Sequence, residues 1–155
     1  MPNNIVICSP EDSEALTDIW RESILQRAHS SFSEEQIFAW AARVRTPEIY
    51  SQEAEHRKIW AWAENETLIA FIELEPNGHI DRLYALKEAS GRGIATKLIR
   101  HVINHAQETD LKQLYTEASD LARPAFERCG FKMIRKNPVN IDGVSMHNWI
   151  MERGL

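Results

Sequence analysis

The chain has 155 residues, of which 43% are hydrophobic and 26% are charged, and its net charge is −5. This length suits one sizeable core, so we expect a single domain over residues 1–155. The acidic balance argues against general nucleic-acid binding, which depends on clustered Lys and Arg. No apolar run approaches the roughly 18 residues that a membrane helix requires, so we expect no membrane partner.

The start of the chain carries no recognisable targeting segment. Residues 1–4 have neither a basic nor an apolar stretch, so we expect no secretory signal. The two cysteines, Cys8 and Cys129, do not suggest a disulfide framework. A reducing, cytoplasmic location is the natural expectation.

The first third of the chain is predicted to be mainly helical. Residues 5–8 form a short apolar strand, and the apolar spacing over 11–29 predicts a helix. A second helix follows to about residue 43, because Ser33 and Gln36 match a capping box. Residues 47–57 are expected to be a polar connector with room for a helical turn.

The rest of the chain alternates strands and helices. Turn signals at 76–78 and 142–143 separate extended runs. A helix with strong apolar periodicity follows residue 93. The predicted strands are 58–63, 68–74, 79–86, 113–117, 132–139 and 144–151, and a further helix spans 121–129. This pattern predicts a mixed α/β domain with one central sheet and helices on both faces.

A glycine-bearing turn, residues 90–96, lies between the strand at 79–86 and the long helix. Unpaired amides and the helix dipole make such a turn suitable for binding phosphate. Gly91 and Gly93 supply two glycines of a dinucleotide fingerprint, but Thr96 occupies the third position. The glycine spacing also excludes a Walker loop.

The segment 90–95 resembles the acyl-CoA loop of GNAT-family N-acetyltransferases, [QR]-x-x-G-x-[GA]. It matches at Gly93 and Ala95 and departs at Ser90, which replaces Gln or Arg. Residues 122–131 resemble the second family signature, a short helix ending in an aromatic-Glu-x-x-Gly-Phe turn. The two segments occur in the family's order, and the resemblance covers about residues 58–135.

This resemblance implies a mostly antiparallel sheet of about seven strands and acetyl-CoA as the co-substrate. It implies that loop amides hold the pyrophosphate, with the Thr96 hydroxyl as an extra donor, and that the strand before the loop pairs with the pantetheine arm. The cofactor-binding residues implied are Leu83, Tyr84, Ala85, Gly91, Arg92, Gly93, Ile94, Ala95, Thr96, Ser119 and Phe126.

Candidate catalytic residues lie on the two strands before the loop. His79 and Asp81 share a strand face, and either can act as the base or bind the substrate amine. Glu73 is a third candidate, because two carboxylates on one face of its strand indicate a wet face. The acceptor pocket is expected to be walled by the aromatic residues Trp20, Phe32 and Trp40 of the first two helices.

The usual family acid is missing from this sequence. Many members place a Tyr before the Glu-x-x-Gly-Phe turn to protonate the CoA thiolate, but here the residue is Phe126, which cannot donate a proton. Ser119 replaces a frequent Asn. Tyr84, Tyr115, Cys129 or water remain as substitutes.

The resulting hypothesis is an acyltransferase that moves an acetyl group to a primary amine, preferably a small molecule, by direct attack in a ternary complex. His101 and His105 have metal-compatible spacing, but no accompanying motif supports a metal, and none is expected. Two alternatives remain open: a non-catalytic acetyl-CoA sensor, and an acetyltransferase acting on protein N-termini or lysines. The protein is expected to be a monomer or a homodimer.

Overall fold

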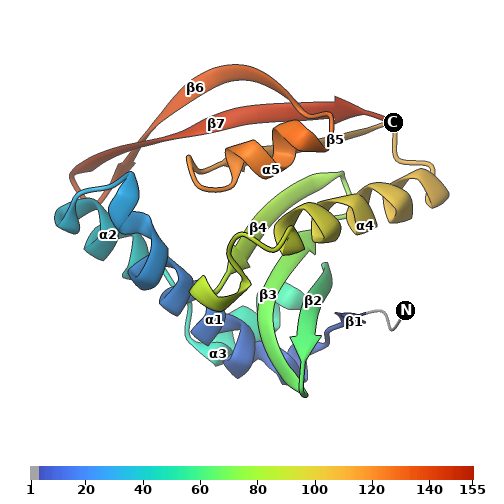
Figure 1. Ribbon diagram of the computed structural model, residues 1–155, viewed down its shortest axis with the longest axis horizontal. Helices are drawn as coiled ribbons and strands as arrows, with labels where there is room; N and C mark the ends of the chain where they lie inside the picture. Colours follow the sequence, from blue (N-terminus) through green and yellow to red (C-terminus); the bar gives the residue numbers. More distant parts are fainter. Residues whose placement is uncertain (1–3) are drawn as a thin grey trace.

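The computed structural model describes residues 4–155; residues 1–3, on which the expectation about a secretory signal partly rests, lie outside it. One seven-stranded, mostly antiparallel sheet has the order β1-β2-β3-β4-β5-β7-β6, which confirms the predicted fold class (Figure 1). The strands are β1 (Ile5–Ile7), β2 (Lys58–Glu64), β3 (Thr67–Leu74), β4 (His79–Ala85), β5 (Gln113–Ala118), β6 (Lys132–Ile141) and β7 (Val144–Gly154).

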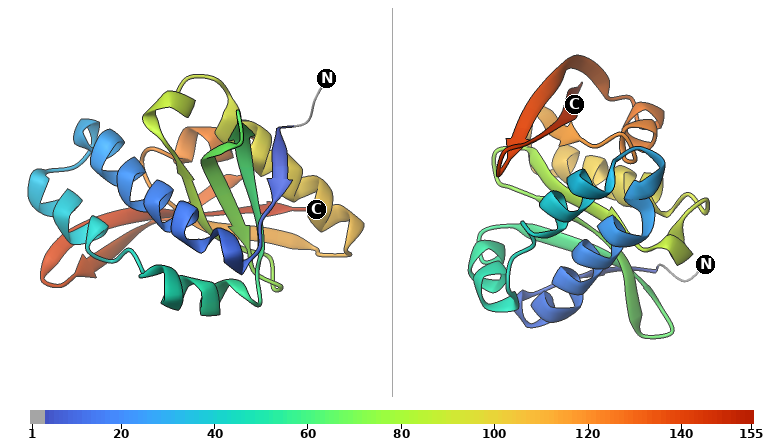
Figure 2. Two further views of the ribbon diagram at one scale, coloured as in Figure 1. Left: turned by 90° about the horizontal axis from the view of Figure 1, so that it is seen from below. Right: turned by 90° about the vertical axis from the view of Figure 1, so that its left-hand side faces the viewer.

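Helices cover both faces of the sheet. The α-helices are α1 (Ser13–Arg27), α2 (Glu34–Ala41), α3 (Pro47–Ala54), α4 (Ile94–Glu108) and α5 (Arg123–Arg128), and the 3-10 turns are η1 (Pro10–Asp12), η2 (Ala28–Ser30) and η3 (Lys87–Ala89). One hydrophobic core joins α4 and α5 to the sheet, and a second joins α1, α2 and α3 to its other face (Figure 2). None of the helices in the described residues is both long and apolar enough to cross a membrane.

Helix starts follow the local sequence closely. The Ser33 hydroxyl accepts from the Gln36 amide at 3.2 Å, and the Gln36 side chain accepts from the Ser33 amide at 2.9 Å, so the predicted capping box is present. The segment 47–57 differs from the expected polar connector. Thr46 caps α3 and Pro47 occupies its first turn, and the helix buries Tyr50 and Ala54. Burial of those two side chains stabilises a helix that propensity alone does not predict.

The sheet splits at its centre. β4 and β5 are parallel and are in register only at His79–Tyr115 and Ile80–Thr116. The Thr116 hydroxyl donates to the Ile80 carbonyl at 2.8 Å, where the pairing ends. Beyond this point the two strands diverge (Figure 1), which leaves backbone groups at the end of β4 without a β5 partner.

A bulge in β4 lies beside this split. The step from Ile72 to Leu74 on β3 corresponds to the longer step from Ile80 to Leu83 on β4. The extra residue turns both Asp81 and Arg82 toward the side of α1 and α3. Strict alternation over β4 does not anticipate this arrangement.

The β6–β7 hairpin curves back over the split and meets α2 at its tip (Figure 1). The Gln36 side-chain amide donates to the Ser145 carbonyl at 2.9 Å. Arg43 lies 3.7 Å from Asp142, which begins the predicted Asp142-Gly143 turn. These contacts close one side of the space between β4 and β5.

Candidate active site

Two adjoining cavities occupy the split between β4 and β5. The larger has a volume of about 210 Å³ and lies toward α2 and the β6–β7 hairpin, and the smaller has a volume of about 50 Å³ and lies toward α1 and α4. Residues from α2, β4 and the segment after β5 line both cavities: Trp40, Leu83, Tyr84, Ser119 and Ala122. A ligand in one cavity therefore adjoins a ligand in the other.

The loop before α4 presents unpaired amides. Gly91 and Gly93 both have φ of +74°, a conformation that favours glycine, and Gly93 caps the helix. The first intrahelical bond runs from the Lys97 amide to the Gly93 carbonyl at 3.0 Å. Within the described chain, the amides from Gly91 to Thr96 have no carbonyl acceptor. They are available to an anion, and the helix dipole favours negative charge there.

Side chains around the loop are already engaged. The Arg92 guanidinium pairs with Glu64 at the end of β2. Thr96 is buried, and its hydroxyl accepts from Arg128 at 3.3 Å. The Thr96 hydroxyl proton has no acceptor among the described residues, and its role as an extra donor to the pyrophosphate stays a prediction.

The expected pantetheine strand borders the smaller cavity. Leu83, Tyr84 and Ala85 all line it, as does Ser119. Arg27 reaches from α1 and donates to the Ala85 carbonyl at 3.1 Å. Phe126 lines the larger cavity and is buried in edge-to-face contact with Phe131, so it packs at the base of the site.

Two carboxylates line the larger cavity, Asp81 from β4 and Glu117 from β5. Among the described residues that line it, none is Lys or Arg. Arg57 donates to Asp81, and His79 Nε2 lies 2.8 Å from one Glu117 oxygen and 3.1 Å from the other. Glu117 was not among the residues that the sequence singled out.

His79 does not line either cavity, contrary to its candidacy as the base. Its ring lies between Glu75, at 2.8 Å, and Glu117, and stacks on Tyr115. Burial lowers the pKa of His79, but the hydrogen bonds to Glu117 and Glu75 outweigh it and raise the pKa to about 9. At neutral pH His79 is therefore a cation and has no free lone pair with which to take a proton.

Glu73 also departs from expectation, because its side of the strand is dry. Its side chain is 0% exposed and lines neither cavity. The carboxylate accepts from Tyr50 at 2.6 Å, Arg57 at 2.8 Å and Arg82 at 3.1 Å. Three donors satisfy it, so its role is to join α3 and the strands rather than to meet a substrate.

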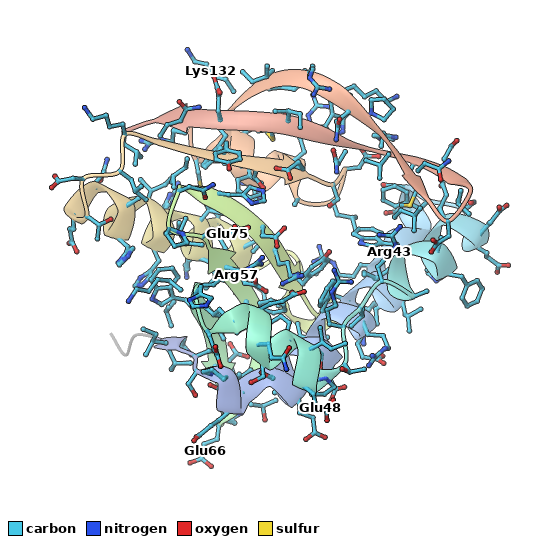
Figure 3. The ribbon with its side chains drawn as sticks, turned by 180° about the vertical axis from the view of Figure 1, so that it is seen from behind. Arg43, Glu48, Arg57, Glu66, Glu75 and Lys132 are labelled. Atoms are coloured by element: carbon cyan, nitrogen blue, oxygen red, sulfur yellow. The ribbon has the colours of Figure 1, made fainter. Side chains whose placement is uncertain are left out.

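Arg57 links this buried cluster to the cavity. It bridges Glu73 and Asp81 and lies 3.5 Å from Glu75 (Figure 3). Glu75, His79 and Asp81 form a group in the described chain with ligand atoms close enough for a metal ion. The Arg57 guanidinium already supplies positive charge to this group, so the geometry does not call for a metal.

Of the three aromatic residues expected to line the acceptor pocket, two line the larger cavity and one does not. Phe32 and Trp40 line the larger cavity and contact each other edge to face at 5.3 Å. Trp20 lines neither cavity. Trp20 lies on the side of α1 that packs against the β4 bulge. Its ring stacks on Tyr84, and the Arg82 guanidinium lies 4.3 Å from the ring centroid.

Of the side chains proposed to replace the missing acid, Tyr84 alone faces the cavities in the described chain. Its hydroxyl accepts from Trp40 at 3.3 Å and keeps its own proton. Burial raises the pKa of Tyr84 to about 12. Tyr115 accepts from Asn77 and Cys129 is buried against Thr96, and neither residue lines a cavity.

Comparison with known proteins identifies the family. Residues 28–153 match the model described as an acetyltransferase (GNAT) domain. The chain belongs to the GNAT acetyltransferase family. A curated relative, the uncharacterized N-acetyltransferase YafP of Escherichia coli K12, is 30% identical over 96% of this chain and 95% of its own length. The protein is thus an N-acetyltransferase.

Solved structures agree with this GNAT assignment. A GCN5-related N-acetyltransferase from Rhodopseudomonas palustris, also described as a class-II aminotransferase, has a TM-score of 0.89 and 27% identity over 97% of this chain and 94% of its own. The PaiA N-acetyltransferase of Thermoplasma acidophilum, solved with coenzyme A, has a TM-score of 0.73 and 24% identity and covers 100% of both chains. The second likeness concerns the fold alone.

The candidate site also contains residues that sequence reasoning missed. His147 on β7 lines the larger cavity, and its Nε2 lies 3.0 Å from Asp120, in the segment between β5 and α5. Trp149 also donates to Asp120, at 2.6 Å. Asp120 and His147 are far apart in the sequence, and their spacing matches no motif. The curvature of the β6–β7 hairpin and the loop after β5 bring them together.

Proposed function

We propose that this single-domain enzyme is cytoplasmic and acetylates a small primary amine by direct attack in a ternary complex with acetyl-CoA. The observation that carries the proposal is the larger cavity. Its two carboxylates, Asp81 and Glu117, face a space with no Lys or Arg among its described lining residues. Asp81 pairs with Arg57 and Glu117 with His79, but neither cation lines the cavity, so the described lining residues present carboxylates and no Lys or Arg. Such a lining favours a cationic amine over an acid.

The shape of the cavity favours a small acceptor over a protein segment. Contacts between α2 and the β6–β7 tip close one side, and Phe32, Trp40 and Tyr84 supply aromatic walls. A volume of about 210 Å³ suits a compact apolar body that carries one amine.

Direct attack is supported by the absence of an activated nucleophile among the described lining residues. No cysteine lines either cavity. The Thr116 hydroxyl donates to the Ile80 carbonyl, and the Ser119 hydroxyl accepts from the Ala122 amide at 3.2 Å. The Ser23 hydroxyl, which lines the smaller cavity, donates to the Trp20 carbonyl at 3.0 Å. None of these three hydroxyls has a base partner among the described residues, which a covalent intermediate would require.

Each substrate has a place in this scheme. Loop amides bind the pyrophosphate, the end of β4 pairs with pantetheine, and Asp81 and Glu117 attract the ammonium group. Tyr84 lines both cavities and is the donor that we assign to the leaving thiolate. Holding both substrates in line supplies much of the rate by orientation.

The test is a steady-state assay with matched acceptors. We expect amines such as phenethylamine and tryptamine to have kcat/KM at least about tenfold above the corresponding amino acids, because the added carboxylate meets Asp81 and Glu117. Asp81→Asn and Glu117→Gln should each raise the acceptor KM about tenfold. Tyr84→Phe should lower kcat with little change in KM.

Two results would contradict different parts of the proposed function. Acetylation of peptides but of no small amine would overturn the acceptor assignment. Binding of acetyl-CoA without turnover on a broad amine panel would point to a sensing module instead. Thermal unfolding of each variant with acetyl-CoA separates a lost catalytic group from a lost fold.

A further inference from the structure

The Asp120–His147 pair at the wall of the larger cavity has no role in the scheme above. His147 comes from β7 and Asp120 from the segment after β5, and both side chains are partly exposed, at 27% and 28%. His147 Nε2 lies 3.0 and 3.1 Å from the two Asp120 oxygens. Phe32 and Trp149 pack against the imidazole, at 6.3 and 5.7 Å between ring centroids. Packing and the hydrogen bond together fix the ring.

We propose that His147 is the general base of the acetyl transfer and that Asp120 positions it. This assignment rests on the proposed function, because it presumes an amine in the larger cavity. It adds a catalytic residue that neither the sequence motifs nor the family signatures identify.

The hydrogen bond decides which nitrogen can act. Asp120 is an acceptor, so the neutral ring carries its proton on Nε2 and leaves the Nδ1 lone pair free. Nδ1 has no hydrogen-bond partner within the described chain. Trp149 donates to Asp120 at 2.6 Å and so holds the carboxylate in its ionised, accepting form. Burial raises the pKa of Asp120, but the bonds from Trp149 and His147 outweigh it and lower the pKa.

The other titratable groups of the cavity are less suited to take a proton. Asp81 already accepts from Arg57, and both Glu117 oxygens face the His79 cation. An ion pair with a cation favours the charged carboxylate and makes it a weaker base. Imidazole changes its protonation near neutral pH, where general-base catalysis is most effective.

Nearby charges also act on this pair. The Arg123 guanidinium lies 4.3 Å from the centroid of the Trp149 ring, and the Lys136 ammonium lies 5.8 Å from it. Two cations therefore contact the tryptophan that donates to Asp120. Asp81 and Glu117 line the same cavity from β4 and β5. Cations therefore lie on the Trp149 side of the pair, and carboxylates lie on the cavity side.

The proposed acetyl transfer conserves atoms and charge. The acceptor ammonium gives one proton to Nδ1 of His147, and the free amine attacks the thioester carbonyl. A C–N bond forms, the C–S bond breaks, and its electron pair goes to sulfur. The second amine proton neutralises the thiolate by way of the Tyr84 hydroxyl, which gives the amide and the CoA thiol. The imidazolium then releases its proton to water.

The first variant is His147→Gln. We expect kcat/KM to fall about 100-fold and the acid limb of its pH profile to disappear. The KM for acetyl-CoA and the thermal stabilisation by acetyl-CoA should remain. His101→Gln is the matched control, because His101 lies on α4 against Trp60 and outside both cavities.

The second variant, Asp120→Asn, tests positioning. Trp149 donates to Oδ1, so we expect the amide oxygen to keep that place and the amide nitrogen to take the place of Oδ2, 3.1 Å from Nε2. The amide nitrogen is a donor, so in that place it favours the tautomer with the ring proton on Nδ1. We expect a loss similar to that of His147→Gln, although the imidazole is still present. Side-chain ¹⁵N spectra should report the Nε2–H tautomer in the parent and the Nδ1–H tautomer in the variant.

The outcomes separate the two proposals. A His147→Gln enzyme with kcat/KM within threefold of the parent, or with an unchanged acid limb, overturns the role of His147 and leaves the acceptor assignment standing. An Nδ1–H tautomer in the parent overturns it without any assay. Failure of the parent to acetylate any amine overturns the proposed function and this assignment with it.

Discussion

At the residue scale, His79 illustrates how a candidate base becomes a structural cation. It lies between Glu75 and Glu117 with its side chain 14% exposed, and its pKa rises to about 9. In the unfolded chain a histidine has a pKa of about 6.5. The stabilising contribution of His79 is therefore fully present below about pH 6.5 and is lost as the pH rises through about 9.

The variant His79→Gln tests this pH-dependent contribution to stability. Between about pH 6.5 and 9.5 the parent should lose about 1–2 kcal/mol of unfolding free energy that the variant does not lose, after allowance for solvent screening. Urea unfolding at several pH values measures this difference. His29→Gln, at an exposed position, is the control and should follow the parent. Parallel curves for parent and His79→Gln would show that the ion pairs contribute nothing.

At the element scale, α3 is held in place by a buried hydrogen bond that its polar sequence does not predict. Tyr50 is 1% exposed, and its hydroxyl donates to the buried carboxylate of Glu73 at 2.6 Å. Arg57, just beyond α3, and Arg82 on β4 complete the donor set. Loss of one donor leaves buried charge less satisfied, and that penalty exceeds the net value of an ordinary hydrogen bond.

We expect Tyr50→Phe to lower the unfolding free energy by about 1–3 kcal/mol, because the ring is kept and only the donor is lost. Tyr115→Phe removes a hydroxyl that contacts exposed Asn77 and should cost less than about 0.5 kcal/mol. Urea denaturation of both variants makes the comparison. Equal losses would mean that Glu73 does not depend on the Tyr50 donor.

At the scale of the whole molecule, acetyl-CoA is expected to contact both sides of the split sheet. The loop and α4 belong to one core, and Tyr84 and Trp40 pack against the other. A ligand bound across them stabilises the entire fold by mass action. At about a hundredfold above its Kd the gain is about 2.7 kcal/mol.

The matched pair for this prediction is Gly93→Glu and Gly143→Glu. Both glycines have positive φ, +74° at Gly93 and +88° at Gly143, and a Cβ at either position meets no atom within 4 Å, so a side chain at either is strained by the backbone and not by contacts. Only Gly93→Glu places a carboxylate at the unpaired amides of the loop. We expect it to abolish the rise in Tm with acetyl-CoA and Gly143→Glu to retain it. Loss of the shift in both would indicate general destabilisation rather than a loop site.

Elements with strong local signals could be predicted from the sequence alone. The capping box at Ser33, the turn at Asp142-Gly143 and the apolar stripe of α4 all act within a few residues, so they can be recognised without the fold. The glycine loop and the second signature likewise pointed to the family and to the acetyl-CoA side of the site. Local order and backbone chemistry carry that information.

The proposed acceptor side could not be predicted from the sequence, because it depends on tertiary structure. The β4 bulge, the dry burial of Glu73 and the meeting of Asp120 with His147 depend on strand register and hairpin curvature, which join residues far apart in the chain. Burial and partners then set which side chain is charged, so His79 and Glu73 became parts of ion-pair networks. A titratable residue type is visible in a sequence, but its protonation and reach are properties of its neighbours.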